Sequence, residues 1–471
     1  MTTRTARTSR CLDADPYYLS LIPSIVLPLH LLSGWSATDR AAYQQALGLI
    51  RNGRAQAARA PLEALEAALA GIDRGLCAAT LAMIDSVAGH DDRVGAGLAR
   101  SLAAAPDCGE YHHFAGSLAV RTREIAAAIG HFEDAVRLDP GLGPAWAALA
   151  LLHGLSGDWA QAEEPARLAL AAGCELGPSL IDYCLMFALH YQGKPVTGPF
   201  LLPGAGGVSE PALARLLARL PAVDFGGSPP WANDAEPTVF VCCDSVYLAQ
   251  HAVPLALSLA ACGAAGRLHI HVINPEPGDA ARLDALSVRL IDIPLTRSFE
   301  TVEMACFGAP AVYYSCARFC RFYQFIKASG RPALMVDADV LFRQPPGKAI
   351  VGADFDIALL DNPGGPPWER FIAGAVYCAA TPAALAFLTR VGFFIGQNLI
   401  ARKGRWFMDQ IALTLAFEAA GPDLRVRSWS SARMFDLTHG PDSILWTVTR
   451  FKSDDDPYNR YKRALLSTAP D

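Results

Sequence analysis

The run ALMVDADVLF, residues 333–342, decides the fold of the second half of the chain, because an apolar segment passes directly into acid. Asp337 and Asp339 follow four apolar residues that are typical of a buried strand. Burying an unpaired carboxylate costs several kcal/mol or shifts its pKa until the group is neutral. We therefore expect a cation to face these two acids.

Strand-like and helical runs alternate around this stretch. We expect strands at 237–244, 269–275, 290–295, 333–342 and 355–361, with helical segments between them. Such alternation is typical of a largely parallel sheet whose ligand site lies at the carboxyl ends of the strands. Four acids lie at these expected ends, namely Asp244, Asp337, Asp339 and Asp361.

The first half of the chain is rich in alanine and leucine at helical spacing, and it repeats. A fixed period of this kind predicts a stack of helical hairpins in which small residues allow close packing. We expect about four units and a degenerate fifth near residues 178–194. Two units align at a spacing of 34 residues, which pairs His112 with Trp146, Gly116 with Ala150 and Ala128 with Ala162.

Composition divides the chain into four segments. We expect an N-terminal cap at 1–40, helical repeats at 41–192, a Pro/Gly-rich linker at 193–236 and an α/β domain at 237–471. The apolar run that starts at Leu19 contains prolines and is shorter than the ~20 residues that a membrane span needs. We therefore predict a cap over the first domain and no membrane span.

Charge and cysteine content restrict the partners. The net charge is -6 and 18% of residues are charged. The chain has no excess of basic residues, so its charge does not indicate nucleic acid as a partner. The 12 cysteines contain no C-x-x-C pair. We interpret them as reduced thiols of a cytoplasmic protein, since a zinc site or disulfide framework would need closer order.

The repeats resemble the tetratricopeptide repeat, and Pro140 lies where that family closes its second helix. Residues 237–460 resemble glycosyltransferases of the GT-A fold. The resemblance is carried by the ordered segments VFVCCDSVY, LALSLA, YYSCARF, MVDADVLF, FIAGAVY and WFMDQIAL. Together they imply an all-α repeat array followed by a Rossmann-like α/β domain that transfers sugar from a nucleotide diphosphate.

The resemblance also implies roles for individual residues. Asp339 would bind Mn²⁺ or Mg²⁺ directly, and Asp337 would contact the ribose or the metal through water. Asp409 and Gln410 would be the catalytic pair. A late histidine often completes the metal shell in relatives, but His439 lies outside any recognisable family motif. The remaining contacts to the nucleotide sugar would come from Asp244, Tyr247, Arg318, Gly374 and Lys452.

Several plainer explanations stay open for these residues. Arg318 could be a surface charge, Lys452 a solvated side chain and Asp409 a helix cap. Haloacid-dehalogenase phosphatases also have a D-x-D motif after a strand, but their pattern has Thr or Val at the position of Leu341 in this chain. A non-catalytic scaffold with a degenerate transferase domain is the main alternative to an enzyme.

The expected class of acceptor is predicted from the helical repeats, since no motif of the α/β domain indicates it. A concave helical array holds a peptide or a protein, so we expect a protein acceptor, for instance a bacterial surface protein. A glycan or lipid acceptor, with the repeats as a scaffold, is the second possibility. The donor sugar, the base and the stereochemical outcome depend on pocket geometry that single motifs do not fix.

Overall fold

The computed structural model describes residues 20, 22, 32, 34–177, 179–196, 198–204, 207–225, 237–350, 354–448 and 456–467. The chain forms two compact units. One, called here the helical unit, ends at Gly198, and the other, called the α/β unit, begins at Pro199. Each is described by itself below.

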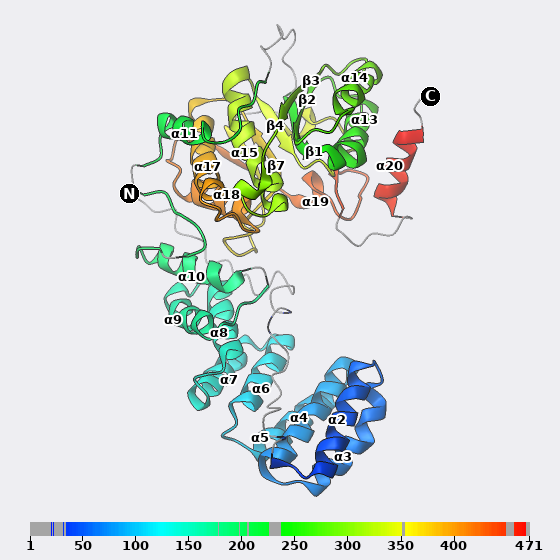
Figure 1. Cartoon of the computed structure of the whole chain (residues 1–471), viewed down its shortest axis with the longest axis vertical. Helices are drawn as coiled ribbons and strands as arrows, with labels where there is room; N and C mark the ends of the chain where they lie inside the picture. Colours follow the sequence, from blue (N-terminus) through cyan, green and yellow to red (C-terminus); the bar gives the residue numbers. More distant parts are fainter. Residues whose placement is uncertain are drawn as a thin grey trace. The chain divides into compact units, whose positions relative to one another are not determined.

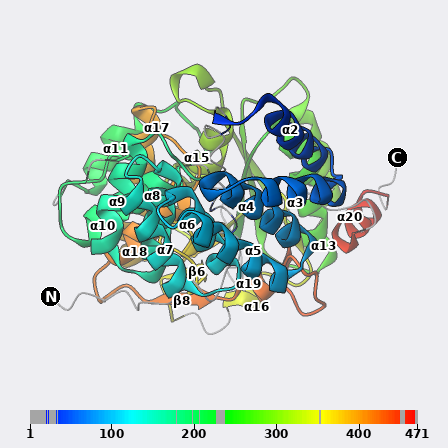
Figure 2. The same ribbon diagram turned by 90° about the horizontal axis from the view of Figure 1, so that it is seen from below.

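The helical unit is a series of helices in which each packs on its neighbours in chain order (Figures 1 and 2). In the described part of this unit, four hairpins are followed by a single helix, α10, which packs on α8 and α9. The degenerate fifth unit expected from the sequence is this helix. The bounds are α2 Ala37–Arg51, η3 Ala55–Ala58, α3 Arg59–Ala68, α4 Gly71–Ala88, α5 Asp91–Ala104, α6 Gly109–Arg121, α7 Ile125–Leu138, α8 Gly143–Ser156, α9 Trp159–Ala171 and α10 Leu180–Tyr191.

Small residues hold the two helices of a hairpin close together. A Cβ at Gly116 in α6 would lie 2.8 Å from the Phe132 ring in α7. Ala128 in α7 and Ala162, its equivalent in α9, are both fully buried. Helix α7 ends at Leu138, just before Pro140, as the resemblance implied. The predicted repeat array is confirmed.

The second hairpin is less regular than the third. Helix α4 spans 18 residues against 13 in α6, and α4 and α5 are joined by Gly89 and His90.

The α/β unit is built on a seven-stranded sheet with the order β3-β2-β1-β4-β7-β6-β8. Strands β3, β2, β1 and β4 are parallel, and β7 runs antiparallel to both β4 and β6. The strands are β1 Thr238–Asp244, β2 Arg267–Ile273, β3 Leu295–Glu300, β4 Ala333–Val336, β6 Ile357–Asp361, β7 Phe371–Cys378 and β8 Val426–Trp429, and a separate pair joins β5 Leu341–Phe342 to β9 Leu445–Trp446.

Helices cover both faces of this sheet (Figure 1). Apolar residues of α13, α14 and α20 share one buried cluster with β1 and β2. On the opposite face Phe240 of β1 packs against Phe322 and Phe325 of α15. The helices are α12 Ser245–Tyr247, η4 Leu248–Ala252, α13 Val253–Ala261, α14 Asp279–Arg289, η5 Met304–Cys306, α15 Pro310–Ser329, α16 Gly347–Ile350, α17 Pro382–Ile400, α18 Met408–Glu418, α19 Ser431–Met434 and α20 Pro457–Ser467.

Two strand predictions needed correction. The expected strand 290–295 is a turn, and β3 begins only at Leu295, because Pro294 has no N–H for a ladder and Ile291 is 89% exposed. The expected strand 333–342 ends at Val336, and a turn separates it from β5. Asp337 and Asp339 lie in that turn. The fold class itself, helical repeats followed by an α/β domain with a largely parallel sheet, is confirmed.

The predicted linker contains a helix that belongs to the α/β unit. Helix α11, Glu210–Leu217, packs on α17, where Gly392 and Gly396 leave room for Leu213 and Leu216. Helix α17 is the one helix in the described part of the chain that is long and apolar enough to cross a membrane. Most of it is buried, as is usual for a core helix.

A buried ionic network joins α15 to the sheet. Glu300 accepts hydrogen bonds from Arg321 Nη2 at 2.6 Å and from Tyr313, and its Oε2 lies 3.0 Å from His271 Nε2. His269, on the same face of β2, lies 2.9 Å from the Thr296 hydroxyl. Burial lowers the pKa of His269 to about 3. The network fixes α15, which carries Arg318, against β2 and β3.

Candidate functional site

A cavity of about 600 Å³ opens at the carboxyl ends of β1 and β4. Five segments supply its wall: the end of β1, the first turns of α15, the turn after β4, the middle of β7 and the start of α18. Eight residues expected from the sequence lie in this wall. They are Asp244, Tyr247, Arg318, Asp337, Asp339, Gly374, Asp409 and Gln410.

The two acids of D-x-D are held by contacts on both sides of their turn. The Asp337 N–H donates to the Gly374 carbonyl at 2.9 Å, which continues the β4–β7 ladder by one residue. The Tyr458 hydroxyl of α20 donates to the Asp339 carbonyl at 2.9 Å. The turn is therefore fixed by the sheet at one end and by the C-terminal helix at the other.

Arg318 is the cation that meets Asp337. Its guanidinium forms an ion pair with Asp337, and its Nη2 lies 3.2 Å from Asp409 Oδ2 and 3.2 Å from the Ala373 carbonyl oxygen. Arg318 is only 8% exposed, so the surface-charge explanation is wrong. The family pattern allowed this arginine to contact either the diphosphate or a nearby acid, and here it contacts two acids.

Burial raises the pKa values of two carboxyls in the cavity. The pKa of Asp339 is raised by burial, which outweighs the opposing effects of Arg318 and Lys462. The pKa of Asp409 is also raised by burial, against the opposing effect of Arg318. A carboxylate in such a position gains from an added positive charge. The electrostatics thus favour cation binding beside Asp339.

Asp409 and Gln410 lie in the first turn of α18. The residue that caps this helix is Phe407, with a φ of 65°, so the helix-cap explanation of Asp409 is wrong. Asp409 Oδ1 accepts the Gln410 N–H at 2.9 Å. The Gln410 side-chain oxygen is buried and has no hydrogen-bond partner among the described residues. Such an oxygen is suited to accept a hydrogen bond from a ligand.

The end of β1 and the middle of β7 complete the wall. Asp244 caps α12 by accepting the Tyr247 N–H at 2.7 Å, and the Tyr247 side chain is 46% exposed. A Cβ at Gly374 would lie 2.2 Å from the Phe435 ring. Gly374 was expected to let a sugar approach the backbone, and the structure gives it a second reason, the packing of Phe435.

Other expected residues lie elsewhere. Lys452 is outside the described residues. His439 is buried, with Nε2 at 2.9 Å from the Thr447 carbonyl and Nδ1 at 3.2 Å from Asp456, so both ring nitrogens already have protein neighbours. Asp361 accepts a hydrogen bond from Ser428 at 2.9 Å and is not part of the cavity wall.

Sequence reasoning missed several residues at this site. Tyr314 and Ser315 lie in YYSCARF, one turn before Arg318, so helical spacing could have found them. Trp406 lies in the wall and is 47% exposed. It is the first residue of the segment WFMDQIAL, of which only Asp409 and Gln410 were expected at the site. Lys462 influences Asp339 from α20, and no local pattern indicated that long-range pairing.

The cavity wall fits a hard divalent cation. Asp337 and Asp339 supply carboxylate oxygens, which Mg²⁺ and Mn²⁺ prefer. Arg318 and Lys462 balance part of the negative charge of these two carboxylates. Burial lowers the pKa of Lys462, and the charge of Asp339 opposes that effect. The donor set is therefore compatible with one cation that shares a further bond with a ligand.

Comparisons with known proteins give structural likeness only. No protein-family model matches the chain, and no curated protein sequence matches it. The bifunctional glycosyltransferase WbbM is 12% identical over 52% of this chain and 52% of its own length, with a TM-score of 0.37. The galactosyltransferase LgtC, solved with donor and acceptor sugar analogues, is 14% identical over 50% of this chain and 97% of its own, with a TM-score of 0.36.

The helical unit has its own likeness. The PilF protein of Pseudomonas aeruginosa is 20% identical over 33% of this chain and 69% of its own length, with a TM-score of 0.29. The chain thus spans about half of WbbM and about two thirds of PilF.

Proposed function

We propose that the α/β unit binds a nucleotide-diphosphate sugar together with a divalent cation and transfers the sugar to an acceptor. One observation carries this proposal. The D-x-D turn after β4 shares a single cavity of about 600 Å³ with the end of β1 and with Asp409 and Gln410 at the start of α18. This volume is within the range of ligand pockets, and four of the five wall segments supply polar side chains.

Asp339 and Asp337 would hold Mn²⁺ or Mg²⁺. The cation, when bound, stabilises the negative charge that develops on the leaving diphosphate. Asp339 is the stronger candidate for a direct ligand, because Asp337 already forms an ion pair with Arg318. Burial keeps the pKa of Asp339 raised, so its carboxylate is stabilised by any positive charge placed beside it.

The nucleotide would lie against the end of β1. Asp244 and the half-exposed Tyr247 ring offer a carboxylate for ribose hydroxyls and an aromatic face for the base. Lys452 stays a proposed contact to the diphosphate. Lys462, whose charge acts on Asp339, is a second basic group of the C-terminal segment.

The sugar would lie between β7 and α18. The unpartnered oxygen of Gln410 would accept a hydrogen bond from a sugar hydroxyl, and the exposed Trp406 ring would pack on the sugar face. Asp409 is ion-paired with Arg318 and accepts a backbone hydrogen bond, so we assign it to positioning both neighbours. This revises the catalytic role that the resemblance implied for it.

Nucleotide-sugar binding tests the proposal directly. The full chain is heated with each nucleotide diphosphate and nucleotide sugar in Mn²⁺, Mg²⁺ or chelator, and the midpoint of unfolding is measured. One nucleotide should raise the midpoint only when a divalent cation is present, by mass action. Asp339→Asn should abolish that shift. Asp361→Asn, at another strand end but outside the cavity, should keep it.

The outcomes separate an enzyme from a scaffold. A cation-dependent shift that survives Asp339→Asn contradicts the assignment of the metal site. If a folded wild-type sample shows no shift with any nucleotide, the transferase proposal is overturned and the non-catalytic scaffold becomes the better explanation.

We further propose that the acceptor is a protein held by the helical unit. The stacked hairpins support this, since such arrays present extended binding surfaces. The test supplies radiolabelled donor, once identified, to the full chain in a cell extract. Label in a protease-sensitive, solvent-insoluble product supports a protein acceptor, whereas label in a solvent-extractable lipid or a free oligosaccharide contradicts it.

A further inference from the structure

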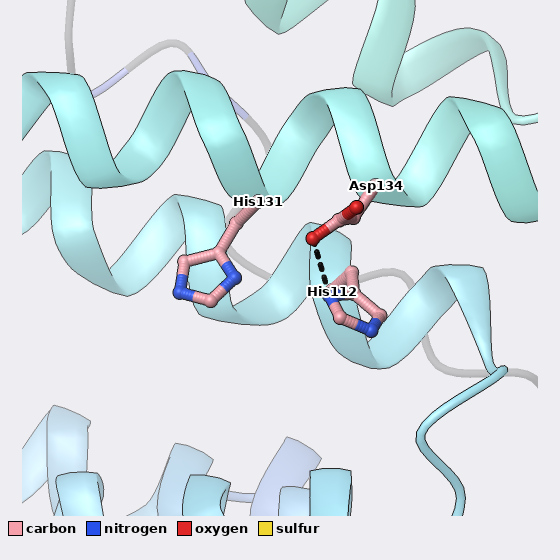
Figure 3. Close-up of side chains that lie close together, drawn as sticks. All are labelled: His112, His131 and Asp134. Carbon is pink, nitrogen blue, oxygen red and sulfur yellow. Dashed lines mark ion pairs between the residues drawn. The ribbon is translucent and has the colours of Figure 1, made fainter.

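Three side chains able to bind a metal gather in the third hairpin of the helical unit. His112 comes from α6, and His131 and Asp134 come from α7 (Figure 3). Their ligand atoms all lie within 4.8 Å of one another, and His112 Nδ1 is 3.8 Å from Asp134 Oδ2. His131 and Asp134 are three residues apart, so one face of α7 presents both.

The tautomer of His112 is set by the repeat scaffold. His112 Nε2 lies 2.9 Å from the Pro106 carbonyl oxygen, which can only accept, so Nε2 carries the proton. The next hairpin repeats this bond 34 residues later, where the indole N–H of Trp146 donates to the Pro140 carbonyl at 2.9 Å. His112 Nδ1 therefore holds the lone pair. It is buried and has no hydrogen-bond partner among the described residues.

The other two side chains place donor atoms beside His112. Arg137 donates to Asp134 Oδ1 at 2.7 Å, while Asp134 Oδ2 faces His112. The His131 ring lies beside the His112 ring, with 6.0 Å between the two ring centroids.

We propose that His112 Nδ1, His131 and Asp134 form a binding site for a divalent transition metal ion, with Zn²⁺ as the best-matched ion. Two imidazole nitrogens and one carboxylate oxygen are donors that zinc accepts, and they leave a coordination position open. The hydrogen bond from His112 Nε2 to Pro106 is the outer contact that usually orients a ligating imidazole.

The site requires only small side-chain movements. Ligand atoms on one tetrahedral zinc are about 3.4 Å apart, given bonds of about 2.1 Å. The Asp134 side chain is 44% exposed and can rotate toward the two rings. A bound ion would join α6 to α7 within one hairpin. The equivalent positions of the next hairpin hold Trp146, Pro165 and Leu168, none of which binds metal, so the site is not a property of the repeat.

Zinc binding by the full chain tests this proposal. Equilibrium dialysis with Zn²⁺ alone is carried out on the Asp339→Asn variant. This substitution removes the proposed cation site of the α/β unit, so that site does not add to the number of zinc ions bound per chain. Binding of one zinc per chain is expected. His131→Asn should weaken it by about 100-fold or more, since even outer-shell contacts are worth 10- to 100-fold. Asp134→Asn, at a half-exposed position, is the second variant in case His131→Asn fails to fold.

His90 supplies the matched control. Its Nδ1 lies 3.6 Å from Asp85, and no third donor joins this pair among the side chains that the structure describes. His90→Gln should leave zinc affinity unchanged. Co²⁺ in the same samples should give the strong visible absorption of a nitrogen-ligated, low-coordinate ion. Absence of zinc binding in the Asp339→Asn protein, or equal affinity in it with and without His131→Asn, overturns the proposal.

Discussion

Arg318 and Asp409 form a buried ion pair, with Arg318 Nη2 3.2 Å from Asp409 Oδ2, and this pair joins α15 to α18 across the floor of the cavity. Removing Arg318 leaves Asp409 buried without its counterion, whereas removing Asp409 leaves Arg318 still paired with Asp337.

Arg318→Met should destabilise the protein by about 3 kcal/mol, the usual effect of breaking a buried pair. Asp409→Asn added to Arg318→Met should recover part of that loss, because the amide needs no counterion. Urea unfolding of the two single variants and the double variant measures the coupling. Strictly additive effects would contradict the pairing.

Gly374→Ala should destabilise the α/β unit by about 1–3 kcal/mol, because the new methyl group overlaps the Phe435 ring. Phe435→Leu in the same chain should relieve that overlap. Gly421→Ala is the control, since a Cβ there meets nothing within 4 Å. Thermal unfolding would rule out the packing explanation if both glycine variants lost equal stability.

Stability should decrease as pH falls below about 6.5. His269 is buried with a pKa lowered to about 3, so the unfolded chain binds a proton in this range and the folded chain does not. The contribution is complete above the unfolded pKa of about 6.5 and is lost as pH falls toward 3, with a slope of at most about 1.4 kcal/mol per pH unit.

His269→Phe should flatten this dependence, and urea unfolding from pH 8 to 4.5 measures it. His90→Gln is the control, because His90 is half-exposed. An unchanged slope in His269→Phe would show that other groups cause the pH dependence.

Gly116→Ala should destabilise the helical unit, because its Cβ would lie 2.8 Å from the Phe132 ring. Gly130→Ala, in α7 with nothing within 4 Å, should instead stabilise it by up to about 1 kcal/mol through the higher helix propensity of alanine. Circular dichroism during thermal unfolding compares the two. Changes of the same sign would mean that helix propensity outweighs packing at both positions.

The sequence predicted the cavity wall better than it predicted the strands. Acids that end apolar runs, such as Asp244 and Asp337, converge wherever parallel strands lie side by side, so their grouping follows from the topology. The start of β3 was misplaced, because Pro294 interrupts an apolar run whose pattern alone looks like a strand.

Long-range pairings account for what could not be predicted. Lys462 acts on Asp339, and Phe435 packs on Gly374, across segments that share no local pattern. The proposed metal site of the helical unit could not be predicted from the sequence for a similar reason. His112 lies on a different helix from His131 and Asp134, and only the packing of the hairpin brings them together.

The bond from the ring N–H at position 112 or 146 to the carbonyl six residues earlier has an evolutionary consequence. An indole and an imidazole make this contact at the same distance of 2.9 Å, so we expect an exchange of the two rings to preserve it. The exchange nevertheless leaves the imidazole with a second nitrogen that has no structural duty. Duplicated units can therefore drift apart in chemistry while they stay alike in shape, and a single copy can acquire a new task at little risk to its neighbours.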